Sequence, residues 1–201
     1  MDLSAGLQRV GMFGGAFDPP HRAHVALARA TVAQLALDRL YVLPTGNAWH
    51  KSRTLTPAED RLAMSRLAFA EIPAVHVDDR ELRRSGPTYS IDTLRELRSE
   101  HPAAQLHLLM GEDQAAGFTR WHAWQEIAQL AVLCVAGRGD GAGVATLRAL
   151  PGVRVALLAL PQMPESATEI RARLTAGQDI TELAGPAVAS YIESHHLYHT
   201  H

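Results

Sequence analysis

The sequence lacks the marks of several protein classes. Its single cysteine, Cys134, lies inside the apolar run LAVLCVAG, which excludes a disulfide framework and a thiolate zinc site. No apolar run approaches the roughly 18 residues that a membrane span requires. The opening MDLSAGLQRV has no basic stretch followed by an apolar core, so no signal peptide is expected. With 19 basic and 21 acidic residues, the formal net charge of −2 argues against a nucleic-acid-coating surface. We therefore expect a cytoplasmic protein without membrane or nucleic-acid partners.

What is present is the composition of a globular domain. The 201 residues are 47% hydrophobic and 20% charged, which is enough to bury a sizeable core. We expect one domain over residues 1–201 that ends in a small helical part at about 164–201. Four of the 11 histidines crowd the C-terminus, where they predict a solvated tail rather than a metal site.

Apolar runs alternate with amphipathic stretches along the chain. Strands that are apolar throughout, each followed by a helix, predict a doubly wound, Rossmann-like α/β fold, a parallel sheet with helices on both faces. Thr56 and Ser90 are the expected helix caps, and the glycine-rich stretch 137–145 is the expected mobile loop. Strands are expected at 9–14, 39–45, 74–79, 105–111, 131–137 and 153–161, and helices at 21–37, 56–72, 90–102, 120–130, 166–177 and 186–196.

The first turn, GMFGGAFDPPHRAH, is unusually rich in glycine, proline and histidine. Gly14 and Gly15 end the first strand where the chain must turn sharply. The following helix would place His21 and His24 three residues apart on one face, near its positive end. A glycine turn, a helix N-terminus and two imidazoles together predict a phosphate site. The structural alternative is a tight turn with two surface histidines.

A second segment, PESATEIR, follows the last expected strand. Ser166 and Glu169 have capping-box spacing, which a well-capped helix explains by itself. Thr168 and Arg171 are not needed for a cap. Both would face an anion held at this helix N-terminus, where arginine can grip phosphate with two parallel hydrogen bonds.

These stretches resemble the motifs of a known superfamily. GGAFDPPHRAH resembles the GGxFDPxHxxH of nucleotidyltransferases, and SATEIR resembles their Ser-x-Thr-x-x-Arg. Three further stretches resemble bacterial nicotinate-nucleotide adenylyltransferases: GPTYSIDTL, the segment Gly111 to Trp121, and the loop PTGNAWHKS. The resemblance runs from about residue 10 to residue 198. This chain departs from the family at Ala48-Trp49, where prolines are usual, and at Glu165, where an apolar residue is usual.

The resemblance implies a reaction and a set of site residues. ATP and nicotinate mononucleotide would give nicotinate adenine dinucleotide and pyrophosphate, with Mg²⁺ held mainly through the substrate phosphates. The nucleophile would be a phosphate oxygen that is already ionised, so no general base is needed. The implied catalytic residues are His21, His24 and Arg171; the implied ATP-binding residues are Gly14, Gly15, Phe17, His21, His24, Ser166, Thr168 and Arg171; the implied nicotinate-nucleotide-binding residues are Asp18, His50, Lys51, Thr88, Tyr89, Asp113 and Trp121.

Several aromatic and acidic residues around the fourth expected strand can also be interpreted without the resemblance. Trp121 and Trp124 lie three apart on the expected helix, and Trp121, which comes earlier, is assigned to stack on a flat ring. Asp113 would accept hydrogen bonds from ribose hydroxyls or cap a helix. Tyr89 would contact the base or pack against the sheet.

Other functions stay open at this point. A pantetheine-phosphate adenylyltransferase shares the first motif but would not explain GPTYSIDTL or FTRW. A nucleotide-binding sensor could keep the pocket without turnover. A fragment of a class I aminoacyl-tRNA synthetase is disfavoured by the short chain and the lack of positive charge. A homodimer is left open.

Overall fold

A parallel sheet of six strands forms the centre of the molecule. The computed structural model describes residues 8–46, 54–137, 141–160, 163 and 165–198. The strand order is β3-β2-β1-β4-β5-β6, and every adjacent pair is parallel. The order reverses between β1 and β4, which places a ligand crevice at their carboxyl ends. The predicted doubly wound sheet is confirmed. The strands are β1 Arg9–Gly15, β2 Arg39–Pro44, β3 Val75–Val77, β4 Gln105–Gly111, β5 Ala131–Ala136 and β6 Val155–Leu158.

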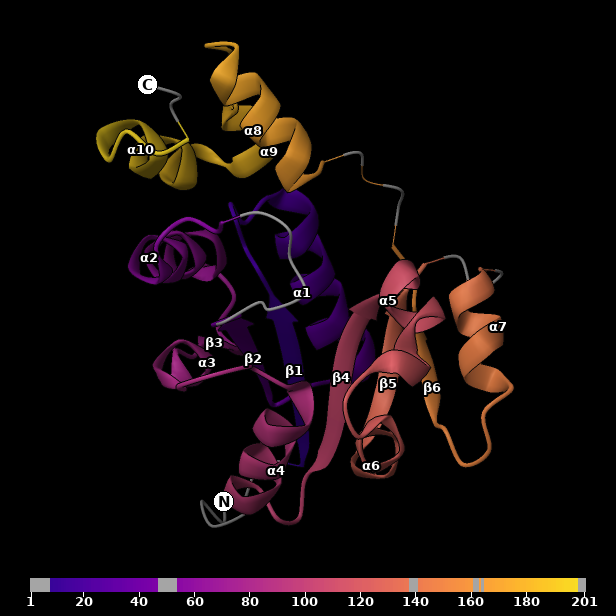
Figure 1. Cartoon of the computed structure of the whole chain (residues 1–201). Helices are drawn as coiled ribbons and strands as arrows, with labels where there is room; N and C mark the ends of the chain where they lie inside the picture. The colour runs from indigo at the N-terminus through magenta and orange to yellow at the C-terminus, as the bar shows by residue number, and fades with distance from the viewer. Residues whose placement is uncertain (1–7, 47–53, 138–140, 161–162, 164, 199–201) are drawn as a thin grey trace.

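Helices cover both faces of this sheet (Figure 1). One face packs Met12, Leu108 and Leu133 against α4 to α7. The opposite face packs Phe13 and Leu109 against α1 and the end of α2. The alternation along β1 and β4 is the period of two that a two-sided core requires. The helices that surround the sheet are α1 Arg22–Leu35, α2 Ala58–Phe69, α3 Arg80–Arg83, α4 Ser90–Glu100, α5 Glu112–Ala116, α6 Trp124–Leu130 and α7 Ala142–Arg148, with a 3₁₀ helix η1 at Phe118–Arg120.

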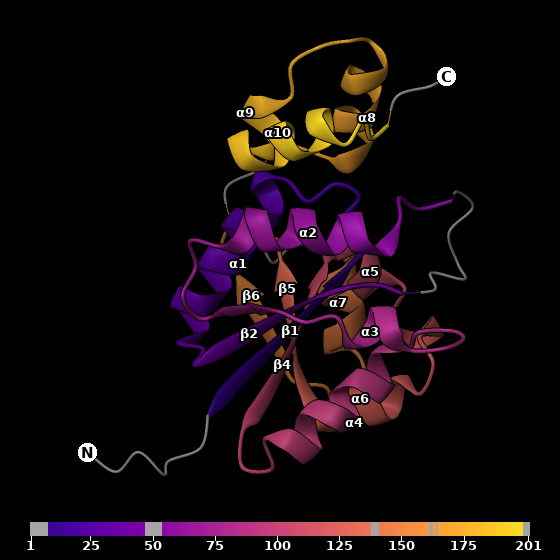
Figure 2. The same cartoon turned by 90° about the vertical axis from the view of Figure 1, so that its left-hand side faces the viewer.

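Three C-terminal helices gather at one end of the molecule, at the top of both views (Figures 1 and 2). They are α8 Ala167–Thr175, α9 Thr181–Ala184 and α10 Pro186–Ser194. Their apolar cluster includes Ile170 and Ile192 and reaches Met64 of α2. Because Met64 belongs to the sheet domain, the C-terminal helices and α2 share a core. The division at about residue 164 stays a prediction.

Two expected helix caps are wrong. Helix α2 begins at Ala58, so Pro57 rather than Thr56 precedes it. The backbone N–H of Thr56, one residue before that cap position, donates to a carboxylate oxygen of Asp18. Helix α4 begins at Ser90 itself, with Tyr89 in the cap position. The spacing of the cap residues in the sequence therefore misplaces each helix start by one residue.

The expected single helix at 120–130 is wrong in its first part. Arg120 ends the 3₁₀ helix η1, and an α-helix, α6, covers only 124–130. Ala123 has a φ of 52°, in the left-handed region that breaks a helix, so Trp121 precedes α6 and Trp124 begins it. Part of the expected mobile loop is helical as well. Helix α7 occupies 142–148, while residues 138–140 lie outside the described residues.

Candidate functional site

The turn from β1 to α1 leaves open space beside one of its two glycines. A Cβ atom added to Gly14 would meet nothing within 4 Å, whereas one added to Gly15 would lie 3.0 Å from the Phe17 ring. Phe17 has a φ of 46° and is only 1% exposed. Its ring packs edge-on against Phe13 and against His24, at centroid distances of 5.3 and 5.0 Å. The buried Phe17 side chain therefore supports a histidine, and a ligand could meet only its backbone.

The two histidines of the turn lie against one another. Their ring centroids are 3.7 Å apart, as expected for neighbours on one face. Helix α1 begins at Arg22, so His21 is its cap residue and the two prolines lie before the helix. The backbone N–H of His21 donates to Nδ1 of His24 at 3.3 Å. A neutral His24 therefore carries its hydrogen on Nε2.

The His21 side chain is buried beside the His24 ring. It is 7% exposed, and burial lowers its pKa from 6.5 to about 4, against an upward effect of the Glu165 charge. Its Nδ1 is buried and has no hydrogen-bond partner in the described part of the chain. Without a ligand, His21 is thus a neutral ring with one N–H. Glu165, one of the positions at which the chain is expected to depart from the family pattern, has a buried carboxylate oxygen with no hydrogen-bond partner in the described part of the chain.

The second expected segment meets the first turn at Asp18. Ser166 is the N-cap of α8 and accepts the Glu169 backbone N–H at 3.1 Å, which confirms the predicted cap. Nη1 of Arg171 donates to the backbone carbonyl of Asp18 at 2.7 Å, and Nη2 donates to the Thr168 hydroxyl at 3.2 Å. Two motifs 153 positions apart in the sequence are therefore brought together. Without a ligand, the Arg171 guanidinium is therefore already hydrogen-bonded to other groups of the protein.

Asp18 is held from several sides. It is 2% exposed, and its Oδ1 accepts the Tyr198 hydroxyl at 2.6 Å. Its Oδ2 accepts the Thr56 N–H at 3.3 Å, just before α2. Both carboxylate oxygens are engaged with protein donors, so the side chain acts as a joint between segments. The expected direct contact of Asp18 with the nicotinate nucleotide has no support in this geometry.

A buried arginine fastens the neighbouring loop ends. Arg61 of α2 is 3% exposed. Its Nη1 donates to the carbonyls of Ala16 and Thr45 at 3.0 and 2.8 Å, and its Nε donates to the carbonyl of Thr56 at 2.9 Å. It thereby joins the first turn to the residues just before and after segment 47–53. Arg61 lies on a helix with polar neighbours, so sequence patterns give no sign of this role.

The expected acceptor side is less completely described. His50 and Lys51 lie outside the described residues, as does Trp49. Thr88 has a buried hydroxyl without a hydrogen-bond partner in the described part, and Tyr89 lies beside the His122 ring at 4.4 Å. Gly46 lies beside Thr88, because a Cβ atom added to Gly46 would lie 3.1 Å from the Thr88 hydroxyl oxygen. The same Cβ atom would clash with the backbone of Glu81 in α3.

The expected site residues after β4 follow the carboxyl end of that strand, but they do not lie on a single helix. Asp113 is exposed in the first turn of α5. Trp121 and Trp124 are both half-buried, with centroids 5.8 and 6.0 Å from the Phe118 ring, so the inferred split into one core and one ligand tryptophan is not visible in their burial. Glu112, which the sequence does not single out, accepts two N–H groups of α7 and so caps that helix.

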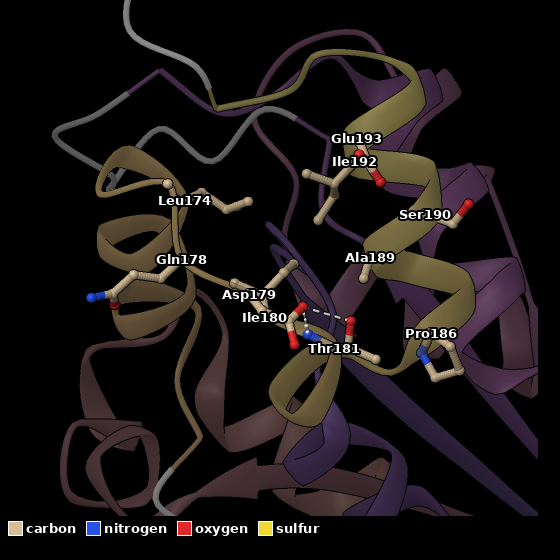
Figure 3. A pocket seen from close by; sticks show the side chains of 11 residues that line it. Leu174, Gln178, Asp179, Ile180, Thr181, Pro186, Ala189, Ser190, Ile192 and Glu193 are labelled. Carbon is tan, nitrogen blue, oxygen red and sulfur yellow. Dashed lines mark hydrogen bonds between the residues drawn. The ribbon is translucent and has the colours of Figure 1, made fainter.

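Outside the expected site, the described residues form a cavity but no metal-binding cluster. Within these residues no group of three or more His, Cys, Asp or Glu side chains could hold a metal ion. No helix in the same described ranges is long and apolar enough to cross a membrane. A cavity of about 410 Å³ opens between α8, α9 and α10 (Figure 3), lined by Leu174, Ile180 and Ile192 with Asp179 and Glu193 among them. None of the expected site residues lines it.

Comparison with known proteins identifies the family. The cytidylyltransferase-like family matches residues 12–173. A probable nicotinate-nucleotide adenylyltransferase of Albidiferax ferrireducens is 52% identical over 96% of this chain and 100% of its own length. One of Methylibium petroleiphilum is 40% identical over 95% and 92%. The structure of Plasmodium falciparum nicotinic acid mononucleotide adenylyltransferase complexed with NaAD shares the fold, with a TM-score of 0.78, 21% identity and coverage of 95% and 97%. The chain belongs to the nicotinate-nucleotide adenylyltransferase family, within the cytidylyltransferase-like proteins.

Proposed function

We propose that the protein transfers the adenylyl group of ATP to nicotinate mononucleotide, which forms nicotinate adenine dinucleotide and releases pyrophosphate. The observation that carries this proposal is the meeting of the two phosphate motifs at Asp18, where Arg171 bonds its carbonyl at 2.7 Å. The family of the relatives agrees with this reaction. The turn, the paired imidazoles and the N-terminus of α8 form one anion-binding corner.

The chemistry requires alignment and charge stabilisation rather than a base. The acceptor phosphate is ionised at neutral pH, so the chain must bring two polyanions together and stabilise charge on the α-phosphate and the leaving pyrophosphate. Alignment of this kind supplies up to roughly 7–11 kcal/mol of the barrier. With Nδ1 occupied, His24 would donate from Nε2 to a phosphate oxygen. His21 would donate its single N–H, and nearby phosphate charge would raise its lowered pKa.

The second segment would grip the outer phosphates. The Arg171 guanidinium bonds the Asp18 carbonyl and the Thr168 hydroxyl, which fixes its place at the start of α8. From there the guanidinium would bind the β- and γ-phosphates, together with the Thr168 hydroxyl and the N-terminal amides of α8. Ser166, occupied as the cap, would shape this helix end. Gly14 and Gly15 would let the backbone approach the nucleotide closely.

A magnesium ion fits this site only as a companion of the substrate. The carboxylate at the turn, Asp18, has donors on both oxygens, and the described residues hold no three-ligand cluster. These features suit an ion held mainly by phosphate oxygens and water, as Mg²⁺ commonly is. When bound, Mg²⁺ would neutralise charge on the phosphates of ATP. The Asp18 carboxylate would serve it at most indirectly.

The acceptor would bind beyond the carboxyl end of β4. Trp121 would stack on the nicotinate ring, Asp113 would accept the ribose hydroxyls, and the partnerless Thr88 hydroxyl offers a hydrogen bond. Tyr89 would close the same side. His50 and Lys51 would add positive charge near the acceptor phosphate, which stays a prediction because they lie outside the described residues. A cytoplasmic location and a homodimer also stay predictions.

The test is pyrophosphate release from ATP and Mg²⁺ with separate acceptors. Nicotinate mononucleotide should support turnover, and nicotinamide mononucleotide should support much less. Turnover only with phosphopantetheine would replace the proposed acceptor while leaving the phosphate site in place. ATP binding without turnover on any acceptor would favour a nucleotide sensor.

A further inference from the structure

We propose that Tyr198, near the C-terminus, is a positioning residue for the phosphate-binding turn. The proposal rests on the adenylyltransferase function proposed above. The Tyr198 hydroxyl donates to Oδ1 of Asp18 at 2.6 Å, a contact that spans 180 positions of the sequence. Asp18 stands three residues before His21. The last described residue of the chain is thereby bonded to the first functional turn.

The chemistry of this contact favours a persistent hydrogen bond. Burial, followed by the bond to Asp18, raises the pKa of Tyr198 far above the physiological range. The phenol is therefore always the donor and the carboxylate the acceptor. A hydrogen bond to a charged acceptor inside a protein is stronger than an ordinary one, and its loss leaves a buried oxygen without that donor.

Asp18 connects the Tyr198 hydrogen bond to both phosphate motifs. Its carboxylate joins Tyr198 to Thr56, and its carbonyl accepts Nη1 of Arg171. One residue thus sets the spacing between the histidine turn and the arginine of α8. Removing the Tyr198 hydroxyl would loosen Asp18, and with it the relative placement of His21 and Arg171.

A second tyrosine in the same C-terminal part provides a matched comparison. The Tyr191 hydroxyl of α10 donates to Oδ1 of Asp60 at 2.9 Å, which is the same tyrosine-to-aspartate chemistry. Asp60 lies in the first turn of α2 and bonds none of the turn residues in the described structure. Tyr191 therefore docks the C-terminal helices without touching the phosphate turn. If Tyr198 merely docks these helices too, removing its hydroxyl should lower the melting temperature but leave kcat/KM and exchange at the turn no more affected than removing the Tyr191 hydroxyl does.

The experiment compares Tyr198→Phe with Tyr191→Phe in the full chain. Each variant loses one hydroxyl and keeps its ring. We expect Tyr198→Phe to lower kcat/KM for ATP by about tenfold at saturating nicotinate mononucleotide, while Tyr191→Phe stays within twofold of the unmodified protein. Amide hydrogen exchange should show faster exchange at residues 13–24 in Tyr198→Phe alone. The melting temperature of each variant measures the docking contribution separately.

The outcomes separate this proposal from the proposed function. Equal kinetics and equal exchange at residues 13–24 in both variants would overturn the positioning role. An equal loss of activity that follows an equal loss of melting temperature would do the same. If the unmodified protein shows no turnover with nicotinate mononucleotide, the proposed function fails, and the exchange comparison still decides whether Tyr198 holds the turn.

Discussion

The two sides of the sheet's carboxyl edge are built differently. On the phosphate side, Asp18, Arg61 and Arg171 receive or donate hydrogen bonds that join β1, α1, α2, α8 and the C-terminal end. On the acceptor side, Thr88 has a buried hydroxyl without a partner in the described residues, and Asp113 is exposed at the start of a five-residue helix. The first side is fastened by protein contacts; the second offers groups that a ligand would complete.

This difference agrees with what each side is proposed to bind. Phosphates carry charge that builds up during the reaction, so their donors gain most from being fixed in advance. A nucleotide acceptor needs stacking and a few hydrogen bonds, which half-buried aromatic rings such as Trp121 provide. We therefore expect substitutions on the phosphate side to lower kcat and substitutions on the acceptor side to raise KM for the acceptor.

The largest effect is expected at His24. His24→Ala should lower kcat by about 10²- to 10³-fold with little change in the KM for ATP, because it removes a donor to developing charge. His24→Gln should retain more activity than His24→Asn, since the glutamine amide nitrogen can donate from the place of Nε2, whereas asparagine reaches only the place of Nδ1, where its oxygen would accept the His21 N–H. Steady-state pyrophosphate release measures both comparisons. A nearly unchanged kcat in His24→Ala would remove His24 from the transition state.

Arg171→Lys should have the next largest effect. Lysine carries the charge but cannot hold the Asp18 carbonyl, the Thr168 hydroxyl and phosphate at once, so kcat/KM for ATP should fall by about 10- to 100-fold. Arg173→Lys is the control on the same helix, where the side chain forms an exposed ion pair with Glu169. That control should stay within twofold. Equal effects of the two substitutions would show that charge alone matters at this helix.

A smaller effect is expected on the acceptor side, at the tryptophan pair. Trp121→Ala should raise the KM for nicotinate mononucleotide by about tenfold, the size of one lost ring stack, and leave the KM for ATP alone. Trp124→Ala, at a similarly half-buried position, should mainly lower the melting temperature. Kinetics with each substrate varied in turn make this distinction. A raised KM for nicotinate mononucleotide in Trp124→Ala, but not in Trp121→Ala, would contradict the prediction and place Trp124 against the acceptor.

The smallest effect is a contrast in pH dependence. Burial lowers the pKa of His21 to about 4, so the unfolded chain binds more protons between pH 4 and 6.5 and stability rises with pH there. Burial raises the pKa of Glu81, under the acceptor side, to about 7, so stability falls as pH rises from 4.5 through 7. The two effects oppose each other. When the pH rises from 5 to 7, the unfolding free energy of Glu81→Gln should increase by about 1–2 kcal/mol relative to that of the unmodified chain. The unfolding free energy of His21→Gln should decrease by a similar amount relative to the unmodified chain.

Chemical denaturation at the two pH values measures these free energies. The glutamine at position 81 can keep an oxygen for the Thr93 hydroxyl, which donates to Glu81 at 2.8 Å, so the fold should persist. Parallel pH curves for the unmodified chain and both variants would contradict the assignment of opposite signs.

Some of this architecture is predictable from sequence and some is not. All six strands follow from short, mostly apolar runs, because a sheet covered on both faces needs no strict alternation. The two motifs that meet at Asp18 can be picked out in the sequence because glycine, histidine and arginine are concentrated in them, and their phosphate-binding role stays a prediction. The broken helix around Trp121 is not, since a left-handed Ala123 leaves no compositional sign.

Contacts distant in sequence account for the other omissions. Arg61, on α2, bonds three carbonyls, yet in the sequence it resembles a solvent-facing arginine on a helix with polar neighbours. Glu112 caps α7 from 31 positions away. Tyr198 reaches Asp18 only once the whole chain has folded. In each case the partner is a backbone group or a distant carboxylate, and local spacing carries no information about either.

The central claim is that the phosphate side is fixed before substrates bind and the acceptor side is not. Amide hydrogen exchange of the unmodified protein, with and without nicotinate adenine dinucleotide, tests it most directly. We predict slow exchange at residues 9–24 in both states, and a gain in protection with the dinucleotide mainly at 84–90 and 112–123. A larger gain at 9–24 than at those segments would contradict the claim.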